Sequence, residues 1–323
     1  MARRSRFDAV LDRALRRTDE IAQSLGTMEL PIRLSELAHP LRVRTVRFEP
    51  LLSSAGLEKT THGFNIIVNT EAYGASHPAG TVLDASGGAW ADLAPPIRFS
   101  VAHEMAHVIF IQVVRDESAD LLRRKQDLLE VACNQIAGRI LVPAQAFKRE
   151  VSDQLLNASH LRTLASKFRV SPEVLVRRLR LRDTRGGFRD VHGYVGLFRE
   201  AEGSLRMVAS QAFGPHAQGR FGRAVRRDLL RPSSNGEARR MSVSDDERRS
   251  LDDLDLPPEV HSFFSEDHVD SRQLEVACSN GLKLPCNITT ARCSRRPTAF
   301  LIAIEVTGSP EDTARPHRHS SDD

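Results

Sequence analysis

The pattern of apolar residues changes twice within the first hundred residues. Apolar side chains recur every three or four positions from residue 7 onward, and a helix-start signal at 31–36 precedes a short second helix that ends near Pro40. Between 43 and 69 the runs VRTVRF and GFNIIVN predict strands instead, separated by a polar stretch. A loop rich in glycine, serine, proline and alanine follows at 73–96. The pattern predicts helices followed by a small sheet.

Two longer helices are predicted next. The segment RFSVAHEMAHVIFIQVV, residues 98–114, is apolar nearly all round and leaves no wide polar face, so it predicts a buried central helix. Residues 121–142 carry an apolar stripe at helical spacing, and Pro143 ends that pattern. Because the link between the two helices is short, we expect them to pack antiparallel.

The remaining chain predicts three further parts. Residues 160–182 have the pattern helix, tight turn, helix, with Ser171 as the N-cap residue and Pro172 at the first helical position. Strand-like runs then dominate 188–307, apart from a poorly patterned polar stretch at about 231–258, and the tail 308–323 is almost free of apolar residues. We therefore expect an α+β protein with domains at 1–150 and 188–307, a helical segment at 151–187 between them, and a disordered tail.

Length and composition restrict the class of protein. The 323 residues, 40% of them hydrophobic, are enough for two or three packed domains. A net charge of +4 permits contact with nucleic acid but does not require it. No apolar run approaches the length of a membrane span, the N-terminus lacks the apolar core of a signal peptide, and four cysteines form no dense disulfide framework. These features predict a cytoplasmic protein with no membrane contact.

Candidate chemistry is concentrated in the predicted central helix. His103-Glu104-Met105-Ala106-His107 is an HExxH motif. Residues four apart lie on one helix face, so both imidazoles can reach a single metal ion, while Glu104 projects toward the same edge. Polar groups on an otherwise apolar helix are costly to bury without partners, and a metal ion would satisfy two of them. We expect His103 and His107 to bind zinc and Glu104 to be the catalytic base.

A catalytic zinc ion usually has three protein ligands and one open position. The metzincin pattern would need glycine and histidine where this chain has Phe110 and Val113, which excludes that class. The next acidic candidates are Asp127 and Glu130 on the second long helix. An antiparallel hairpin returns Glu130 to the histidines, so we expect Glu130 to be the third metal ligand. Asn134, one turn later, would support the site from outside the ligand set.

Three stretches together resemble a known family. GFNIIVN, RFSVAHEMAH and EVACNQIAGRILVP resemble the ImmA/IrrE family of bacterial metallo-endopeptidases over roughly residues 7–150. Cys133, Ile136 and Ile140 stand where the family pattern usually has alanine, phenylalanine and leucine. The resemblance implies a mainly helical, zincin-like domain of gluzincin type, with His103, His107 and Glu130 on zinc and Glu104 as general base. It also implies a protein substrate, often a helix-turn-helix repressor cleaved in a stress or mobile-element response.

The sequence leaves several alternatives open. Two histidines and one carboxylate accept manganese as well as zinc, expected at one ion per chain. His62, Tyr73 and His160 are candidates for stabilising an oxyanion. By analogy with relatives that carry a GAF-like sensor, 188–307 would bind an effector or the repressor. The alternative function is a DNA-binding or partner-sequestering regulator with a structural zinc site, in which 160–182 meets phosphates through Arg177, Arg178, Arg180 and Arg182.

Overall fold

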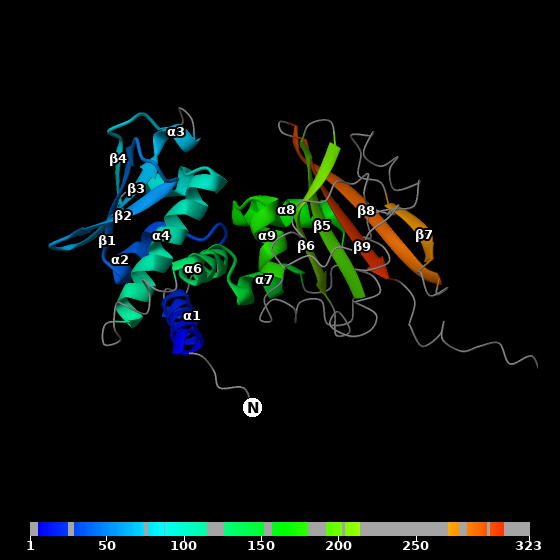
Figure 1. Ribbon diagram of the computed structural model, residues 1–323, viewed down its shortest axis with the longest axis horizontal. Helices are drawn as coiled ribbons and strands as arrows, with labels where there is room; N and C mark the ends of the chain where they lie inside the picture. Colours follow the sequence, from blue (N-terminus) through cyan, green and yellow to red (C-terminus); the bar gives the residue numbers. More distant parts are fainter. Residues whose placement is uncertain are drawn as a thin grey trace, which may run out of the picture. The chain divides into compact units, whose positions relative to one another are not determined.

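The protein is described here by a computed structural model, whose chain divides into two compact units (Figure 1). The first unit comprises residues 1–147 and 166–171, and the second comprises 148–165 and 172–323. The residues that the structure describes are 6–24, 29–73, 77–86, 88–114, 126–151, 157–179, 192–201, 204–213, 271–277, 283–295 and 298–306.

Helix α4, Pro95–Val113, is the central element of the first unit and packs against α1 and α6. Pro95 and Pro96 occupy its first positions, where a missing N–H costs no helical hydrogen bond. Most of its residues are buried, as the continuous apolar pattern predicted. The other helices in this part of the chain are α1 (Arg6–Ser24), α2 (Leu34–Leu41), α3 (Thr70–Tyr73), the 3-10 helix η2 (Gly88–Asp92), α6 (Gln126–Leu141) and α7 (Ala144–Val151).

A four-stranded sheet of order β2-β3-β1-β4 completes the first unit. Its strands are β1 (Val43–Glu49), β2 (Ala55–Thr60), β3 (Gly63–Asn69) and β4 (Val82–Asp84). The runs predicted as strands form β1 and β3, which pair in parallel, whereas β2 and β4 pair antiparallel at the two edges. Gly63 begins β3 at φ +147°, where an added Cβ would lie 2.1 Å from the carbonyl oxygen of Arg42. Only glycine permits this close approach.

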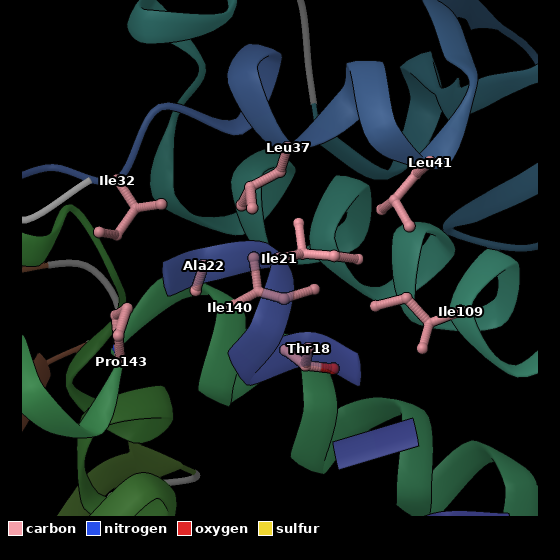
Figure 2. Close-up of a pocket in the computed structure, with 9 residues that line it drawn as sticks. All are labelled: Thr18, Ile21, Ala22, Ile32, Leu37, Leu41, Ile109, Ile140 and Pro143. Atoms are coloured by element: carbon pink, nitrogen blue, oxygen red, sulfur yellow. The ribbon is translucent and has the colours of Figure 1, made fainter. Parts of the chain in front are cut away.

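A small apolar cavity of about 10 Å³ lies among α1, α2, α4 and α6 (Figure 2). It has room for about one water molecule. Its lining is aliphatic apart from Thr18, whose hydroxyl already donates a hydrogen bond to the carbonyl of Ala14. The cavity is therefore a packing gap in the core and offers no polar group to a ligand.

The second unit contains a five-stranded antiparallel sheet of order β6-β5-β9-β8-β7, with α9 packed against β5 and β6. The runs predicted as strands form β5, β6 and β9, and the predicted helix-turn-helix segment forms α8 and α9. Helices α7 and α8 each contribute residues to both units. The elements are α8 (Ala158–Phe168), α9 (Pro172–Leu179), β5 (His192–Ala201), β6 (Ser204–Phe213), β7 (Ser271–Ala277), β8 (Lys283–Arg295) and β9 (Thr298–Val306).

The predicted α+β class is confirmed by this mixture of helices and sheets. The comparison of 188–307 with a GAF-like sensor and the domain boundaries at 150 and 187 stay predictions. The polar stretch 231–258 and the tail 308–323 lie outside the described residues. Among the described helices, none combines the length and the apolar composition that crossing a membrane requires.

Candidate metal centre

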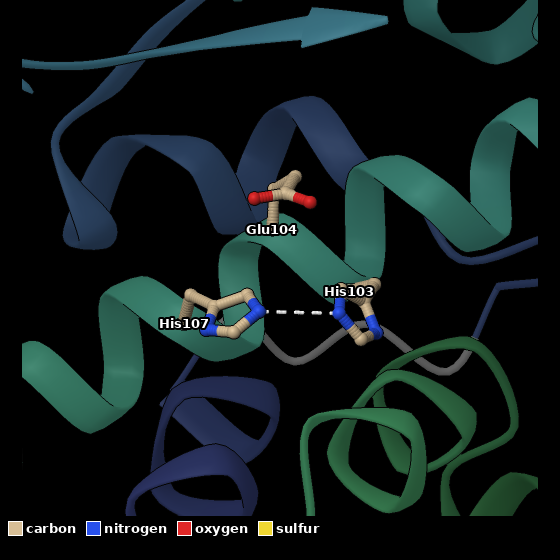
Figure 3. Close-up of side chains that lie close together, drawn as sticks. All are labelled: His103, Glu104 and His107. Atoms are coloured by element: carbon tan, nitrogen blue, oxygen red, sulfur yellow. Dashed lines mark hydrogen bonds between the residues drawn. The ribbon is translucent and has the colours of Figure 1, made fainter. Parts of the chain in front are cut away.

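One turn of α4 brings His103, Glu104 and His107 together (Figure 3). Their potential ligand atoms lie within 4.8 Å of one another. The two imidazole rings meet edge to face, and their Nε2 atoms are 3.1 Å apart. In Figure 3 the two rings lie along one side of the helix with a nitrogen of each joined by the marked contact, and the Glu104 carboxylate extends from the ribbon above them. The i, i+4 spacing of the histidines thus yields the convergence that the sequence predicted.

Helix α6 adds a carboxylate to this pair. Glu130 places Oε2 3.1 Å from Nε2 of His103 and Oε1 3.5 Å from Nε2 of His107. The side chains of His103 and His107 are 15% and 21% exposed, whereas that of Glu130 is 46% exposed, so the cluster opens to solvent on the α6 side. Asp127, the other acidic candidate, is exposed in the first turn of α6.

The hydrogen bonds of His103 provide a test of whether this cluster fits a metal ion. Its Nδ1 lies 2.9 Å from Oδ1 of Asn134, the contact expected of a supporting residue. An amide oxygen only accepts, so Nδ1 carries the proton and Nε2 of the neutral ring presents a lone pair. That lone pair faces a carboxylate oxygen and a second imidazole nitrogen at 3.1 Å each. A divalent metal ion among these atoms would be held by the lone pair, the second imidazole and the carboxylate together, so the donor set fits such an ion.

Burial changes the protonation of the groups around this centre. Desolvation, followed by the charge of Glu130, raises the pKa of Glu104 to about 7. A carboxyl group with such a pKa both accepts and releases a proton near neutral pH. Burial and then the neighbouring His103 lower the pKa of His107, which favours the neutral imidazole that a metal requires.

Cys133 of α6 also contacts the cluster, although no role was predicted for it. Its Sγ lies 3.5 Å from Nδ1 of His107, and its side chain is fully buried. Burial, with the charges of Glu130 and Glu104, raises the pKa of this thiol well above its ordinary value. The signal available in the sequence was its position beside Asn134, three residues after Glu130.

The three oxyanion candidates have different surroundings. Tyr73 is half-buried, and its hydroxyl shares a short hydrogen bond with Oγ of Ser100, one turn before Glu104 on α4. His62 is exposed in the turn between β2 and β3, and His160 lies in α8, in the part that belongs to the second unit. Tyr73 is thus the candidate that the described contacts connect to α4.

The predicted phosphate-binding arginines are largely engaged or buried. Arg177 places Nε 3.1 Å from Oε1 of Glu173, and Arg178 is only 2% exposed. Arg180 and Arg182 lie outside the described residues. Arg178 therefore does not present its guanidinium to solvent, and within the described residues 160–179 only Arg177 of the predicted phosphate-binding arginines is exposed.

Comparison with known proteins agrees with this geometry over part of the chain. The family model described as the IrrE N-terminal-like domain, a peptidase family, matches residues 94–180. No curated protein matches the chain. A solved structure titled "Mycobacterium tuberculosis transcriptional regulator" aligns at 14% identity with a TM-score of 0.42, covering 94% of this chain and 82% of that one. The segment 94–180, which is similar to the IrrE N-terminal-like domain, holds His103, Glu104, His107 and Glu130.

Proposed function

We propose that the protein is a zinc-dependent endopeptidase with His103, His107 and Glu130 as metal ligands and Glu104 as general base. The observation that carries this proposal is the convergence of two imidazole Nε2 atoms and a carboxylate within 3.5 Å. The contact of Asn134 with Nδ1 of His103 orients the Nε2 lone pair of that ring toward the same point. The match of 94–180 to a peptidase family supports it. We expect one zinc ion per chain, and manganese would suit the same donors.

The chain's own residues account for the proton transfers of peptide hydrolysis. When bound, the metal ion supplies a Lewis acid that polarises the scissile carbonyl and acidifies water. Glu104 accepts a proton from the water molecule whose oxygen bonds to the carbonyl carbon. It then delivers that proton to the amide nitrogen as the C–N bond breaks, so that the products are a carboxylic acid and an amine. Burial raises the pKa of Glu104, which favours its holding the proton that it delivers to the amide nitrogen.

The proposed substrate is a regulatory protein, in particular a helix-turn-helix repressor in a stress or mobile-element response. This step rests on the resemblance of the motifs to the ImmA/IrrE family and on the domain match. The side chain of Glu130, at the rim of the cluster, is 46% exposed, which supports access by a polypeptide substrate. The cytoplasm is the proposed compartment.

Metal content separates the proposed ligands from their neighbours. We expect about one zinc ion per chain by mass spectrometry in the wild type, in Glu104→Gln and in Asp127→Ala. His103→Ala and Glu130→Ala should lose it. Asp127→Ala is the matched control, because Asp127 is an exposed acid on the same helix, three residues before Glu130. A wild-type chain that takes up no zinc on reconstitution would overturn the metal centre.

Peptide cleavage tests the catalytic role of Glu104. The zinc-loaded wild type and Glu104→Gln are incubated with a proteome-derived peptide library, and new N-termini are counted by mass spectrometry. We expect the variant to keep zinc and to lose roughly 100- to 10,000-fold in rate, since only the base is removed. Equal cleavage by both proteins would contradict that role. Zinc uptake without any product would favour the alternative of a regulator that sequesters its partner.

A further inference from the structure

Three residues of α6 face the two imidazoles, and the proposed function uses only two of them. Glu130 lies against both Nε2 atoms, and Asn134 contacts Nδ1 of His103. The third residue is Cys133, whose Sγ lies 3.5 Å from Nδ1 of His107. Each imidazole thus presents Nε2 to the cluster, while its Nδ1 meets a side chain of α6.

The contact at Cys133 has the geometry of an outer hydrogen bond to a metal ligand. When Nε2 of a neutral imidazole holds a metal ion, its proton is on Nδ1, which then needs an acceptor. Sulfur is a weak acceptor, and hydrogen bonds to it are longer than those to oxygen. The Cys133 side chain is fully buried, so water does not compete for this position. An alanine, which the family pattern has here, would offer His107 no partner.

We propose that Cys133 is a positioning residue for His107, acting on that ring as Asn134 acts on His103. Its sulfur holds the ring with Nδ1–H toward α6 and the Nε2 lone pair toward Glu130 and His103. The inference rests on the proposed metal centre. It adds that metal affinity in this chain depends on a thiol that is not itself a ligand.

Zinc affinity measured by competition with a chromophoric chelator tests this role. Loss of a side chain that hydrogen-bonds to a metal ligand weakens metal binding roughly 10- to 100-fold. Because sulfur is a weak acceptor, we expect the zinc affinity of Cys133→Ala to fall about 10-fold. Cys133→Ser keeps an acceptor and should stay within about threefold of the wild type. Ile136→Val trims a fully buried side chain one turn further along α6 and controls for packing. It should bind zinc like the wild type.

Three results of this measurement would overturn the proposal. The first is a Cys133→Ala variant that binds zinc as tightly as the wild type. The second is an Ile136→Val variant whose zinc affinity falls as far as that expected of Cys133→Ala. The third is a Cys133→Ser variant whose zinc affinity is as low as that of Cys133→Ala. A wild-type chain that binds no metal would instead overturn the proposed function. Absence of cleavage by a zinc-loaded wild type would leave the affinity measurement intact, so the two failures are distinguishable.

The visible spectrum of the cobalt-substituted protein gives a second readout that does not depend on activity. A turned His107 ring changes the ligand field, so we expect altered d–d bands in Cys133→Ala and unaltered bands in Ile136→Val. Superimposable spectra of wild type and Cys133→Ala would contradict the positioning role. An intense sulfur-to-cobalt charge-transfer band in the wild type would overturn it too, because Cys133 would then be a ligand.

Discussion

Glu305 on β9 is a carboxyl group that the fold holds away from water. It is only 8% exposed, and its register partners are Gly193 on β5 and Asn287 on β8. Burial raises its pKa above the ordinary value of 4.5. The folded chain therefore binds the proton of this group more tightly than the unfolded chain does.

The raised pKa of Glu305 makes the free energy of unfolding depend on pH. Below the pKa that Glu305 has in the unfolded chain, the group is protonated in both the folded and the unfolded state, so folding buries no charge there. As pH rises through the folded pKa, the folded state must accept a buried charge, so stability falls. In urea denaturation, the free energy of unfolding of Glu305→Gln should equal that of the wild type at about pH 4 and exceed it at about pH 8.

A matched control for Glu305 is the exposed Glu71 of α3. Glu71→Gln should follow the pH dependence of the wild type, since both states of that carboxyl are hydrated. If Glu305→Gln lost stability with rising pH as steeply as the wild type, burial of the Glu305 charge would not be the cause.

The candidate site was predictable from sequence as far as helical periodicity reaches. His103 and His107 are four residues apart, and so are Glu130 and Asn134, so each pair must share a helix face. The contact of Cys133 with His107 depends on how α6 is rotated against α4, which no local pattern encodes. The same holds for the contact of Tyr73 with Ser100, because it joins two elements far apart in sequence.

At the scale of elements, a bidentate ion pair connects α1 to α6. Arg139 donates from Nε to Oδ1 and from Nη2 to Oδ2 of Asp19, each at 2.7 Å. The side chains are 17% and 39% exposed, so solvent screens the pair only in part. A double-mutant cycle with Arg139→Ala and Asp19→Ala should give a coupling energy of about 1 kcal/mol in urea denaturation.

A second ion pair on α1 serves as the control for this cycle. Arg17 and Glu20 are 44% and 63% exposed at a spacing of three residues, and their coupling should be about 0.3 kcal/mol. Equal coupling in the two cycles would show that the geometry of the Arg139–Asp19 pair adds nothing to the docking of α1.

In the four-stranded sheet, the strands at the edges were the elements hardest to predict. The central strands β1 and β3 have alternating or continuous apolar runs, because both of their neighbours are protein. The edge strand β2, with the sequence AGLEKT, has no fully buried residue and lies in a stretch predicted as polar connection. Its backbone pairs with β3 all the same. Pairing of backbone groups at an edge needs no apolar side chains, so the hydrophobic pattern misses it.

At the scale of the whole molecule, the chain leaves its first unit and returns to it. Residues 166–171 group with 1–147, although 148–165 group with the second unit. Within the first unit, Phe168 packs on Phe147 with ring centroids 6.5 Å apart, and Arg169 donates to the carbonyl oxygens of Ala91 and Leu93. Sequence patterns describe neighbours along the chain, so this return was not visible in them.

The single tryptophan of the chain makes the return testable. Trp90 is fully buried in the first unit, and its indole N–H donates to the carbonyl of Leu83 at 3.2 Å. Phe168→Ala removes a fully buried ring and should lower the unfolding free energy reported by Trp90 fluorescence by about 3–5 kcal/mol.

Phe198, which is 1% exposed in the second unit, provides the matched deletion. Phe198→Ala should leave the unfolding transition reported by Trp90 unchanged, because each unit has its own core. It should shift the separate unfolding transition of the second unit, which circular dichroism follows. If Phe168→Ala leaves the Trp90 transition unchanged, residues 166–171 do not stabilise the first unit. If Phe198→Ala shifts that transition as far as Phe168→Ala does, the two cores unfold as one cooperative body and each unit does not unfold independently of the other.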